Sequence, residues 1–226
     1  MHTRSLAILA TLLVACGGAP PATPTSESPA TPAAEAPAKA PEAEAPAKTP
    51  ADDRVLADSG LGVGGKFRAF QILNCESGDE YCQVCRYGGS PKIMAVGTLG
   101  DPEFKNDLQN IDALVKKYGE DKVKAFAVIA DIHDGKGSTP QEGRDELVAQ
   151  AKAMRTELGI SIPVVVPALE EGGVNKAFDD YYNITQSRTL MFADGRNAIR
   201  YSAVAPTDLS GLHTAITEVI GGDAAG

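Results

Sequence analysis

In the longer, C-terminal part of the chain, apolar strand patterns alternate with amphipathic helix patterns, and this order constrains the fold more than any other feature. Short apolar runs at 92–96, 122–131 and 162–166 predict strands, and helical spacing of apolar residues follows each run. A strand–helix–strand order implies parallel strands covered by their crossover helices. Asp194-Gly195, between two further strand patterns, predicts a late β-hairpin before a closing helix. The expected class is α/β, with a central mixed β-sheet flanked by helices.

Capping residues mark the helix boundaries. Asp101 followed by Pro102 predicts the start of a helix, because Asp accepts hydrogen bonds from free N–H groups and proline suits the first helical position. Gly119 predicts the end of that helix. The run 139–142 has the Thr-x-x-Glu spacing of a capping box and predicts the start of the next helix.

The N-terminus has the features of an export signal. Arg4 precedes an apolar run at 6–15 that is too short to span a bilayer as a helix. The run ends at Cys16, and residues 13–16 resemble the bacterial lipoprotein signal, in which the cysteine is lipidated and becomes the new N-terminus. The alternative is an ordinary signal peptide that happens to contain a cysteine. We expect residues 1–15 to be a lipoprotein signal peptide and Cys16 to be the lipidation site.

Composition changes sharply after this signal. Nine of the fifteen prolines lie in residues 17–51, which contain no Val, Ile, Leu, Met or aromatic residue. Such a segment has nothing to bury that would offset the entropy cost of ordering. We therefore expect residues 16–52 to be a lipidated cysteine followed by a disordered Pro/Ala-rich linker. Residues 53–226 are long enough for one domain with its own core.

The charge balance limits the choice of partners. Removal of residues 1–15 leaves 20 Lys and Arg against 30 Asp and Glu, a formal charge of 20 − 30 = −10. An acidic chain is a poor partner for nucleic acid. We expect the membrane to be reached through the N-terminal lipid. The expected location is the bacterial cell envelope, with the chain lipid-anchored on the periplasmic side or at the outer membrane.

A C-x-x-C motif formed by Cys82 and Cys85 lies within residues 74–90, which otherwise read as a polar loop. Cysteines at this spacing form a small ring that can be oxidised and reduced. A predicted strand at 66–73 precedes the loop and the strand at 92–97 follows it. The pair is therefore expected on the chain that enters this strand, not on the chain that leaves it.

The order of elements, with the hairpin and the closing helix, resembles the thioredoxin fold of the peroxiredoxin-like and membrane-tethered thioredoxin group. The resemblance covers residues 62–222. Residues 82–91 also resemble a C-x-x-C-x-Y-G-x-x-P segment of bacterial envelope proteins of thioredoxin type. The resemblance implies a thioredoxin-like fold for residues 53–226. By analogy with N-terminal nucleophiles in C-x-x-C pairs it favours Cys82 as the attacking thiolate, although either Cys82 or Cys85 can take that role.

Two hallmarks of that family are missing. Its members carry their dithiol directly after the strand that corresponds to 92–96, where this chain has residues 98–101 and no cysteine. They also place a cis-proline just before the strand at 189–192, where this chain has Arg188. A cis bond before a residue other than proline costs about 3 kcal/mol. Ordinary thioredoxin catalysis is therefore not expected at the usual site.

Three interpretations of the domain's cysteines remain open. In the redox interpretation Cys82 and Cys85 form a reversible disulfide, and Cys75 is an accessory thiol that can resolve it. In the structural interpretation Cys75 pairs with Cys82 or Cys85 and closes the loop. In the metal interpretation the three thiolates bind copper(I) or zinc, although no histidine lies nearby to complete the site. The run 87–91 breaks helices, so no helix N-terminus is expected to stabilise a thiolate.

The sequence thus favours a cell-envelope lipoprotein whose thioredoxin-like domain performs thiol–disulfide exchange through a displaced C-x-x-C. We expect its partners to be envelope proteins that carry thiols or disulfides, and we expect no metal and no cofactor. The alternative is a non-catalytic binding or scaffold domain that kept the fold while its cysteines became structural.

Overall fold

The computed structural model describes residues 54–133 and 135–223. The predictions for the signal peptide, for Cys16 and for the linker at 16–52 lie outside these residues. In the described part of the chain, no helix combines the length and the hydropathy that crossing a bilayer requires.

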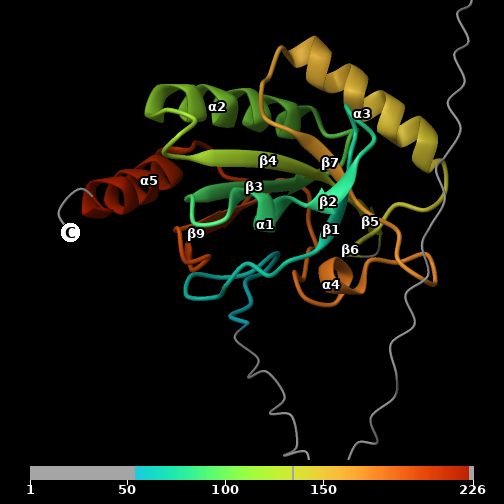
Figure 1. Cartoon of the computed structure of the whole chain (residues 1–226), viewed down its shortest axis with the longest axis horizontal. Coiled ribbons are helices and arrows are strands. Elements are labelled where there is room, and N and C mark those ends of the chain that lie inside the picture. Colours follow the sequence, from blue (N-terminus) through green and yellow to red (C-terminus); the bar gives the residue numbers. More distant parts are fainter. Residues whose placement is uncertain (1–53, 134, 224–226) are drawn as a thin grey trace, which may run out of the picture. The chain divides into compact units, whose positions relative to one another are not determined.

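A seven-stranded mixed sheet forms the centre of the described domain (Figure 1), which confirms the predicted fold class. The neighbouring strands β7, β4 and β3 are parallel to one another. Each strand beyond them, on both sides, pairs antiparallel with the strand next to it. The strand order is β2-β1-β7-β4-β3-β8-β9, with bounds β1 Gln71–Asn74, β2 Glu80–Cys82, β3 Lys92–Gly97, β4 Lys124–Ile129, β7 Val164–Pro167, β8 Thr189–Ala193 and β9 Ile199–Val204.

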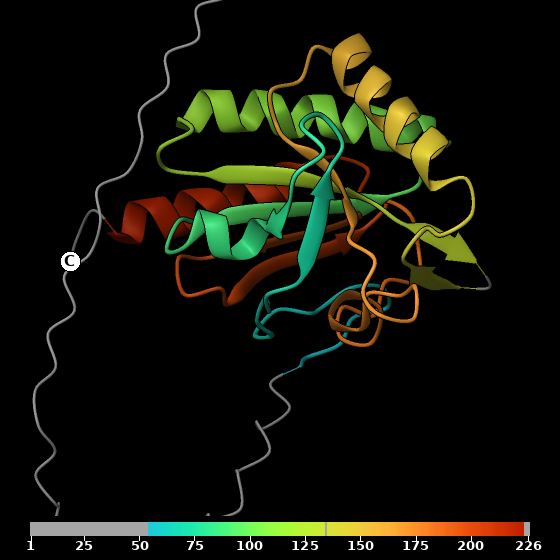
Figure 2. The same cartoon turned by 45° about the vertical axis from the view of Figure 1, so that its right-hand side comes forward.

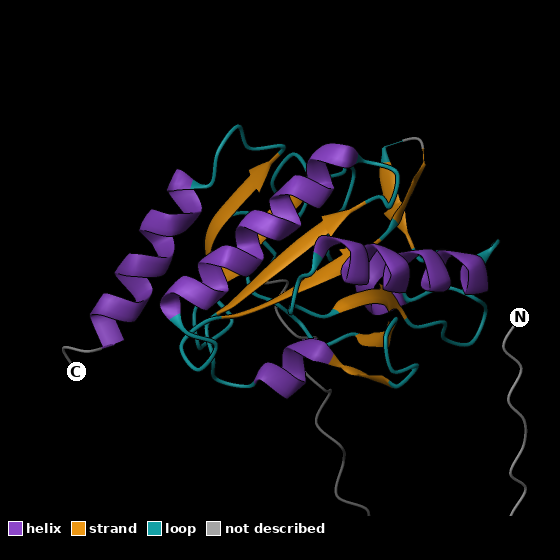
Figure 3. Cartoon of the chain, turned by 90° about the horizontal axis from the view of Figure 1, so that it is seen from above, coloured by secondary structure: helices purple, strands orange, loops and turns teal. Residues whose placement is uncertain are grey.

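Three long helices cover one face of this sheet, namely α2 (Pro102–Tyr118), α3 (Arg144–Leu158) and α5 (Ser210–Asp223). The crossovers from β3 to β4 and from β4 to β7 step in the same direction across the sheet. Because such crossovers are right-handed, α2 and α3 lie on the same side (Figure 3). The other face is covered by α1 (Gln83–Tyr87), α4 (Lys176–Asp179) and the chain at 54–70.

The central strands are buried on both faces, as parallel strands between two layers must be. In β3, Ile93 and Ala95 pack beneath the three long helices, whereas Met94 and Val96 pack toward the opposite layer. Every residue of β3 is buried. This explains why the strand pattern at 92–96 is a continuous apolar run instead of an alternating one.

The sequence located some helix ends correctly. The Asp101 side chain accepts hydrogen bonds from the N–H groups of Glu103 and Phe104, at 3.0 and 3.3 Å, and α2 ends before Gly119, as predicted. The prediction that the capping box at 139–142 starts the next helix was wrong, because α3 begins only after Gly143 and has no side-chain cap.

The hydroxyl of Thr139 is used elsewhere. It donates to the carboxylate of Asp179 at 3.1 Å and accepts from the N–H of Asn175 at 3.0 Å. This tertiary contact with the residues around α4 replaces the predicted local cap.

The prediction of a polar loop at 74–90 was wrong, because this segment contains β2 and α1. The carbonyl of the Asn74 side chain accepts from the N–H groups of Glu76 and Ser77, at 2.8 and 3.2 Å, and this bends the chain into a β1–β2 hairpin (Figure 2). The predicted strand at 66–73 is correspondingly shorter, since regular pairing begins only at Gln71.

Further differences concern short elements. The chain after β4 forms a separate two-stranded sheet of β5 (Asp131–His133) and β6 (Lys136–Ser138). The helical segment after β7 is the four-residue α4, and the last helix, α5, runs through Gly221 to Asp223.

Candidate redox site

Cys82 and Cys85 are joined by a disulfide at the junction of β2 and α1. Their Cα atoms are 5.2 Å apart. Cys82 is the N-cap of α1, and its sulfur accepts a hydrogen bond from the N–H of Cys85 at 3.1 Å. The expectation that no helix follows the pair was therefore wrong, although α1 has only five residues.

The two cysteines differ in exposure. Cys85 is exposed and Cys82 is half-buried, whereas the two residues between them, Gln83 and Val84, are buried. Val84 packs into the apolar core beneath α1. Gln83 is only 1 % exposed, and its Oε1 has no hydrogen-bond partner among the described residues. Cys85 is therefore exposed to solvent, while the buried residues Gln83 and Val84 hold this part of the chain against the core.

The residues around the motif fasten α1 to the sheet. The Arg86 guanidinium lies 4.8 Å from the centre of the Tyr81 ring. The hydroxyl of Tyr87 donates to the carbonyl of Ala125 in β4 at 2.8 Å, and its ring packs edge-on against Phe126. Burial raises the pKa of Tyr87 well above its ordinary value, so that the phenol remains a hydrogen-bond donor.

A buried lysine fixes the chain that leads from α1 into the sheet. Lys92 donates from Nζ to the carbonyl of Gly88 at 2.7 Å and to the side chain of Asn197 at 2.5 Å. Burial lowers the pKa of Lys92, and the nearby Asp194 opposes this effect. Lys92 opens β3, so the disulfide lies near the end where β3 begins.

Cys75 does not join the pair. It is a free thiol, 4 % exposed, in the core beneath the long helices. The pairing of Cys75 with Cys82 or Cys85, considered from the sequence, is not the arrangement in the structure. Because Cys82 and Cys85 are bonded to each other, the three thiolates of the metal interpretation are not available together. The described residues contain no group of three or more His, Cys, Asp or Glu side chains that could hold a metal ion.

We expect Cys75 to resist alkylation in the folded protein. Burial raises the pKa of its thiol from 9.0 to about 11, an effect that Arg144 opposes only in part. At pH 8 the fraction of reactive thiolate is then about 100-fold lower than in the unfolded chain, since each unit of pKa changes this fraction about tenfold. Iodoacetamide labelling followed by mass spectrometry, with and without denaturant, measures the ratio. Equal labelling rates in the two states would contradict this prediction.

The usual catalytic end of the fold is occupied differently. Residues 98–101 lie between β3 and α2 and contain no cysteine. Arg188, at the position of the family's proline, has φ 59°, and no peptide bond of the described residues is cis. Its guanidinium forms two bonds with the carboxylate of Asp107 in α2, at 2.7 and 3.1 Å. This ion pair was not foreseen, because Asp107 carries no sequence signal beyond its place in a helix.

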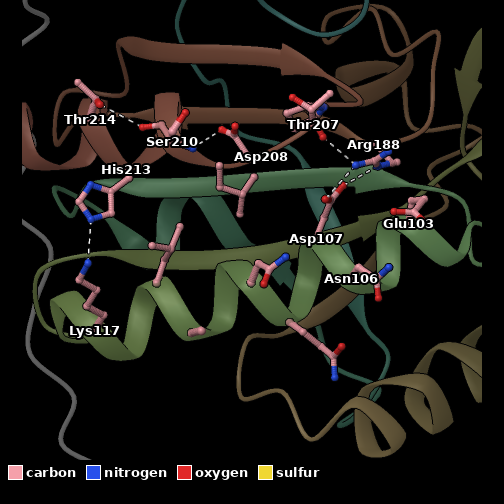
Figure 4. A pocket seen from close by; sticks show the side chains of 16 residues that line it. Glu103, Asn106, Asp107, Lys117, Arg188, Thr207, Asp208, Ser210, His213 and Thr214 are labelled. Carbon is pink, nitrogen blue, oxygen red and sulfur yellow. Dashed lines mark hydrogen bonds and ion pairs between the residues drawn. The ribbon is translucent and has the colours of Figure 1, made fainter.

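A groove of about 1010 Å³ runs between α2 and the chain of 206–214 (Figure 4). The Arg188–Asp107 ion pair lies at one end, and Lys117 and His213, whose nitrogens are 2.9 Å apart, lie at the other. The groove belongs to the face of the sheet covered by the long helices, whereas α1 lies on the opposite face. The groove is therefore separate from the disulfide.

No protein-family model matches the sequence, and no curated protein matches it. The fold matches many solved structures. A thiol-disulfide isomerase from Corynebacterium glutamicum aligns with a TM-score of 0.52 and 17 % identity over 69 % of this chain and 95 % of that chain. A thioredoxin-like superfamily protein aligns with a TM-score of 0.53 and 18 % identity over 69 % and 96 %.

A hypothetical protein from Sinorhizobium meliloti aligns with a TM-score of 0.54 and 13 % identity, over 72 % of this chain and 86 % of that chain. Identities this low establish the fold and not the activity. The described domain is similar to these proteins in architecture, a mixed sheet flanked by helices in a thioredoxin-like fold. In this chain, Cys82 and Cys85 form a disulfide.

Proposed function

We propose that this protein is a lipid-anchored protein of the bacterial cell envelope whose thioredoxin-like domain performs thiol–disulfide exchange through Cys82 and Cys85. The observation that carries the redox part is the disulfide between these residues with Cys85 open to solvent. A disulfide must be reachable by an attacking thiolate before it can exchange. The anchor at Cys16 and the linker at 16–52 rest on the sequence alone.

The two sulfurs have different roles in this proposal. A partner thiolate attacks the sulfur of Cys85, the more exposed residue of the pair, and a bond forms between the partner and Cys85 while the Cys82–Cys85 bond breaks. Cys82 leaves as a thiolate, which the N–H of Cys85 stabilises by the hydrogen bond already present at 3.1 Å. Exposure thus favours Cys85 as the sulfur that joins the partner, in place of the Cys82 that analogy suggested.

The exchange then completes within the partner. A second partner thiolate attacks the partner sulfur of the mixed disulfide and releases Cys85 as a thiolate. The partner loses two electrons and two protons and gains a disulfide, while Cys82 and Cys85 become two thiols. In the reverse direction Cys85 attacks a partner disulfide and Cys82 resolves the mixed disulfide.

A redox titration of the full chain tests this function. We expect the Cys82–Cys85 couple to titrate reversibly between about −120 and −270 mV, the range of thioredoxin-type exchange proteins. Differential alkylation and mass spectrometry report the oxidised fraction, and Cys75 serves as an internal thiol that does not change. A pair that stays oxidised below about −300 mV is a structural clamp and would refute the proposal.

The groove between α2 and the chain of 206–214 favours a second candidate, a binding domain without redox chemistry. Its volume is in the range of ligand pockets, and it occupies a face that the disulfide does not reach. A binding domain requires neither exposure nor reversibility of the Cys82–Cys85 disulfide. The redox titration therefore separates the two candidates.

A further inference from the structure

We propose that the partner of the Cys82–Cys85 pair is an extended, cysteine-bearing polypeptide segment that docks as an additional strand along the outer edge of β2. The inference rests on the proposed exchange function and names its substrate class. β2 is the first strand in the order of the sheet, so within the described part of the chain no strand pairs with its outer side. β2 ends at Cys82 itself, so this edge adjoins the disulfide.

Hydrogen bonds on both sides of β1 show which backbone groups face which neighbour. The N–H of Asn74 donates to the carbonyl of Asp79, on the β2 side, at 2.9 Å. The N–H of Cys75 donates to the carbonyl of Val164, on the β7 side, at 3.0 Å. Successive residues of a strand direct these groups to opposite sides. Ile72 lies two residues before Asn74, so the N–H and C=O of Ile72 are also directed toward β2.

The same alternation fixes the directions in β2. Ile72 lies opposite Tyr81, so the N–H and C=O of Tyr81 face β1. Those of Glu80 and Cys82 consequently face the open edge. The carbonyl of Cys82 stands at the N-cap of α1, which leaves the N–H and C=O of Glu80 and the N–H of Cys82 to receive a partner strand.

A strand in this position brings its own cysteine to the disulfide. Paired strands lie about 4.8 Å apart, and residues directly opposite each other have Cβ atoms about 5 Å apart. The Cα atom of Cys85 is 5.2 Å from that of Cys82. A partner segment paired along β2 therefore holds a cysteine opposite Cys82 beside the Cys82–Cys85 disulfide.

The edge carries only part of the usual protection against pairing. Edge strands that are not used for binding are commonly very short or carry charged residues, proline or a bulge, and β2 has three residues including the charged Glu80. Residues Glu80–Cys82 contain neither proline nor lysine, and their pairing with β1 shows no register shift. Pairing through the main chain demands an extended backbone more than a particular side chain, so the substrate class is an unfolded or extended polypeptide.

Proline at position 80 tests the edge. Glu80→Pro removes an N–H that faces outward and leaves the bonds to β1 in place, whereas Glu80→Ala removes the side chain and keeps the N–H. The reduced full chain, with Cys16→Ala in every sample, is mixed with an unstructured disulfide-bonded peptide or with the aromatic disulfide dithiobis-nitrobenzoate. For Glu80→Pro we expect an about tenfold slower reaction with the peptide and an unchanged reaction with the aromatic disulfide. Glu80→Ala should match the unsubstituted chain with both.

A measurement that needs no proline covers the case in which Glu80→Pro fails to fold. In the mixed disulfide trapped between the peptide and the Cys82→Ser variant, the amide of Glu80 should exchange its hydrogen at least about tenfold more slowly than in the free variant. Unchanged exchange would overturn the docking mode, as would equal peptide rates for Glu80→Pro and Glu80→Ala. A dimer that Glu80→Pro dissociates with no change in peptide rate would make this edge a contact between copies and also overturn it. If the unsubstituted chain reacts with neither disulfide, the proposed function itself fails.

Discussion

Replacing both Cys82 and Cys85 by serine should reduce thiol–disulfide exchange to the rate of the buffer alone. The domain has no other exposed thiol among its described residues, because Cys75 is buried and burial raises its pKa to about 11. The reaction with an unstructured disulfide-bonded peptide, followed in the full chain with Cys16→Ala, measures the effect. Cys75→Ala is the matched control and should keep the rate of the unsubstituted chain.

The single variants identify the sulfur that joins the partner. In Cys82→Ser the exposed Cys85 can attack a partner disulfide, but no thiol remains to resolve the product. The mixed disulfide should therefore accumulate and be visible by mass spectrometry. Cys85→Ser leaves only the half-buried Cys82 and should accumulate much less of it. More trapping by Cys85→Ser than by Cys82→Ser would reverse the assignment, and exchange that survives the double substitution would exclude the pair as the redox site.

Removing the Arg188 guanidinium should substantially lower the free energy of unfolding of the domain. The side chains of Asp107 and Arg188 are only 7 % and 17 % exposed, and the pair is held by two hydrogen bonds. Arg188 also donates to the carbonyl of Pro206 at 2.9 Å. In Arg188→Ala the Asp107 carboxylate stays buried without its counter-charge, which costs about 3 kcal/mol in the free energy of unfolding. Urea denaturation of the full chain measures this difference.

Arg196→Ala is the matched control for that measurement. Arg196 is exposed at the turn between β8 and β9, so its removal should change the free energy of unfolding by less than about 0.5 kcal/mol. Adding Asp107→Asn to Arg188→Ala should recover part of the loss, because the unpaired charge is then gone. If Arg188→Ala costs no more than Arg196→Ala, the ion pair does not stabilise this end of the fold.

The local parts of the fold could be predicted because their causes are local. Apolar runs long enough for a strand, Asp101 before Pro102, and Asp194-Gly195 each act through neighbouring residues, and the strands, the α2 cap and the hairpin follow from them. The failures have tertiary causes. Thr139 caps no helix because Asn175 and the region of α4 take its hydroxyl. The loop at 74–90 contains a strand and a helix because β1 and the core hold them.

The candidate site likewise has features that follow from the sequence and features that depend on the tertiary structure. The sequence by itself determined that the domain has a C-x-x-C before β3 and no cysteine at the usual position, because these are facts of residue type and order. Only the tertiary structure decided that Cys75 is withdrawn into the core, that Cys85 is the exposed member of the pair, and that β2 leaves an open edge beside it. Burial and strand pairing join residues that are distant along the chain, and no local pattern encodes which of them will meet. Arg188 shows the same limit: its departure from proline was visible in the sequence, but its partner Asp107 was not.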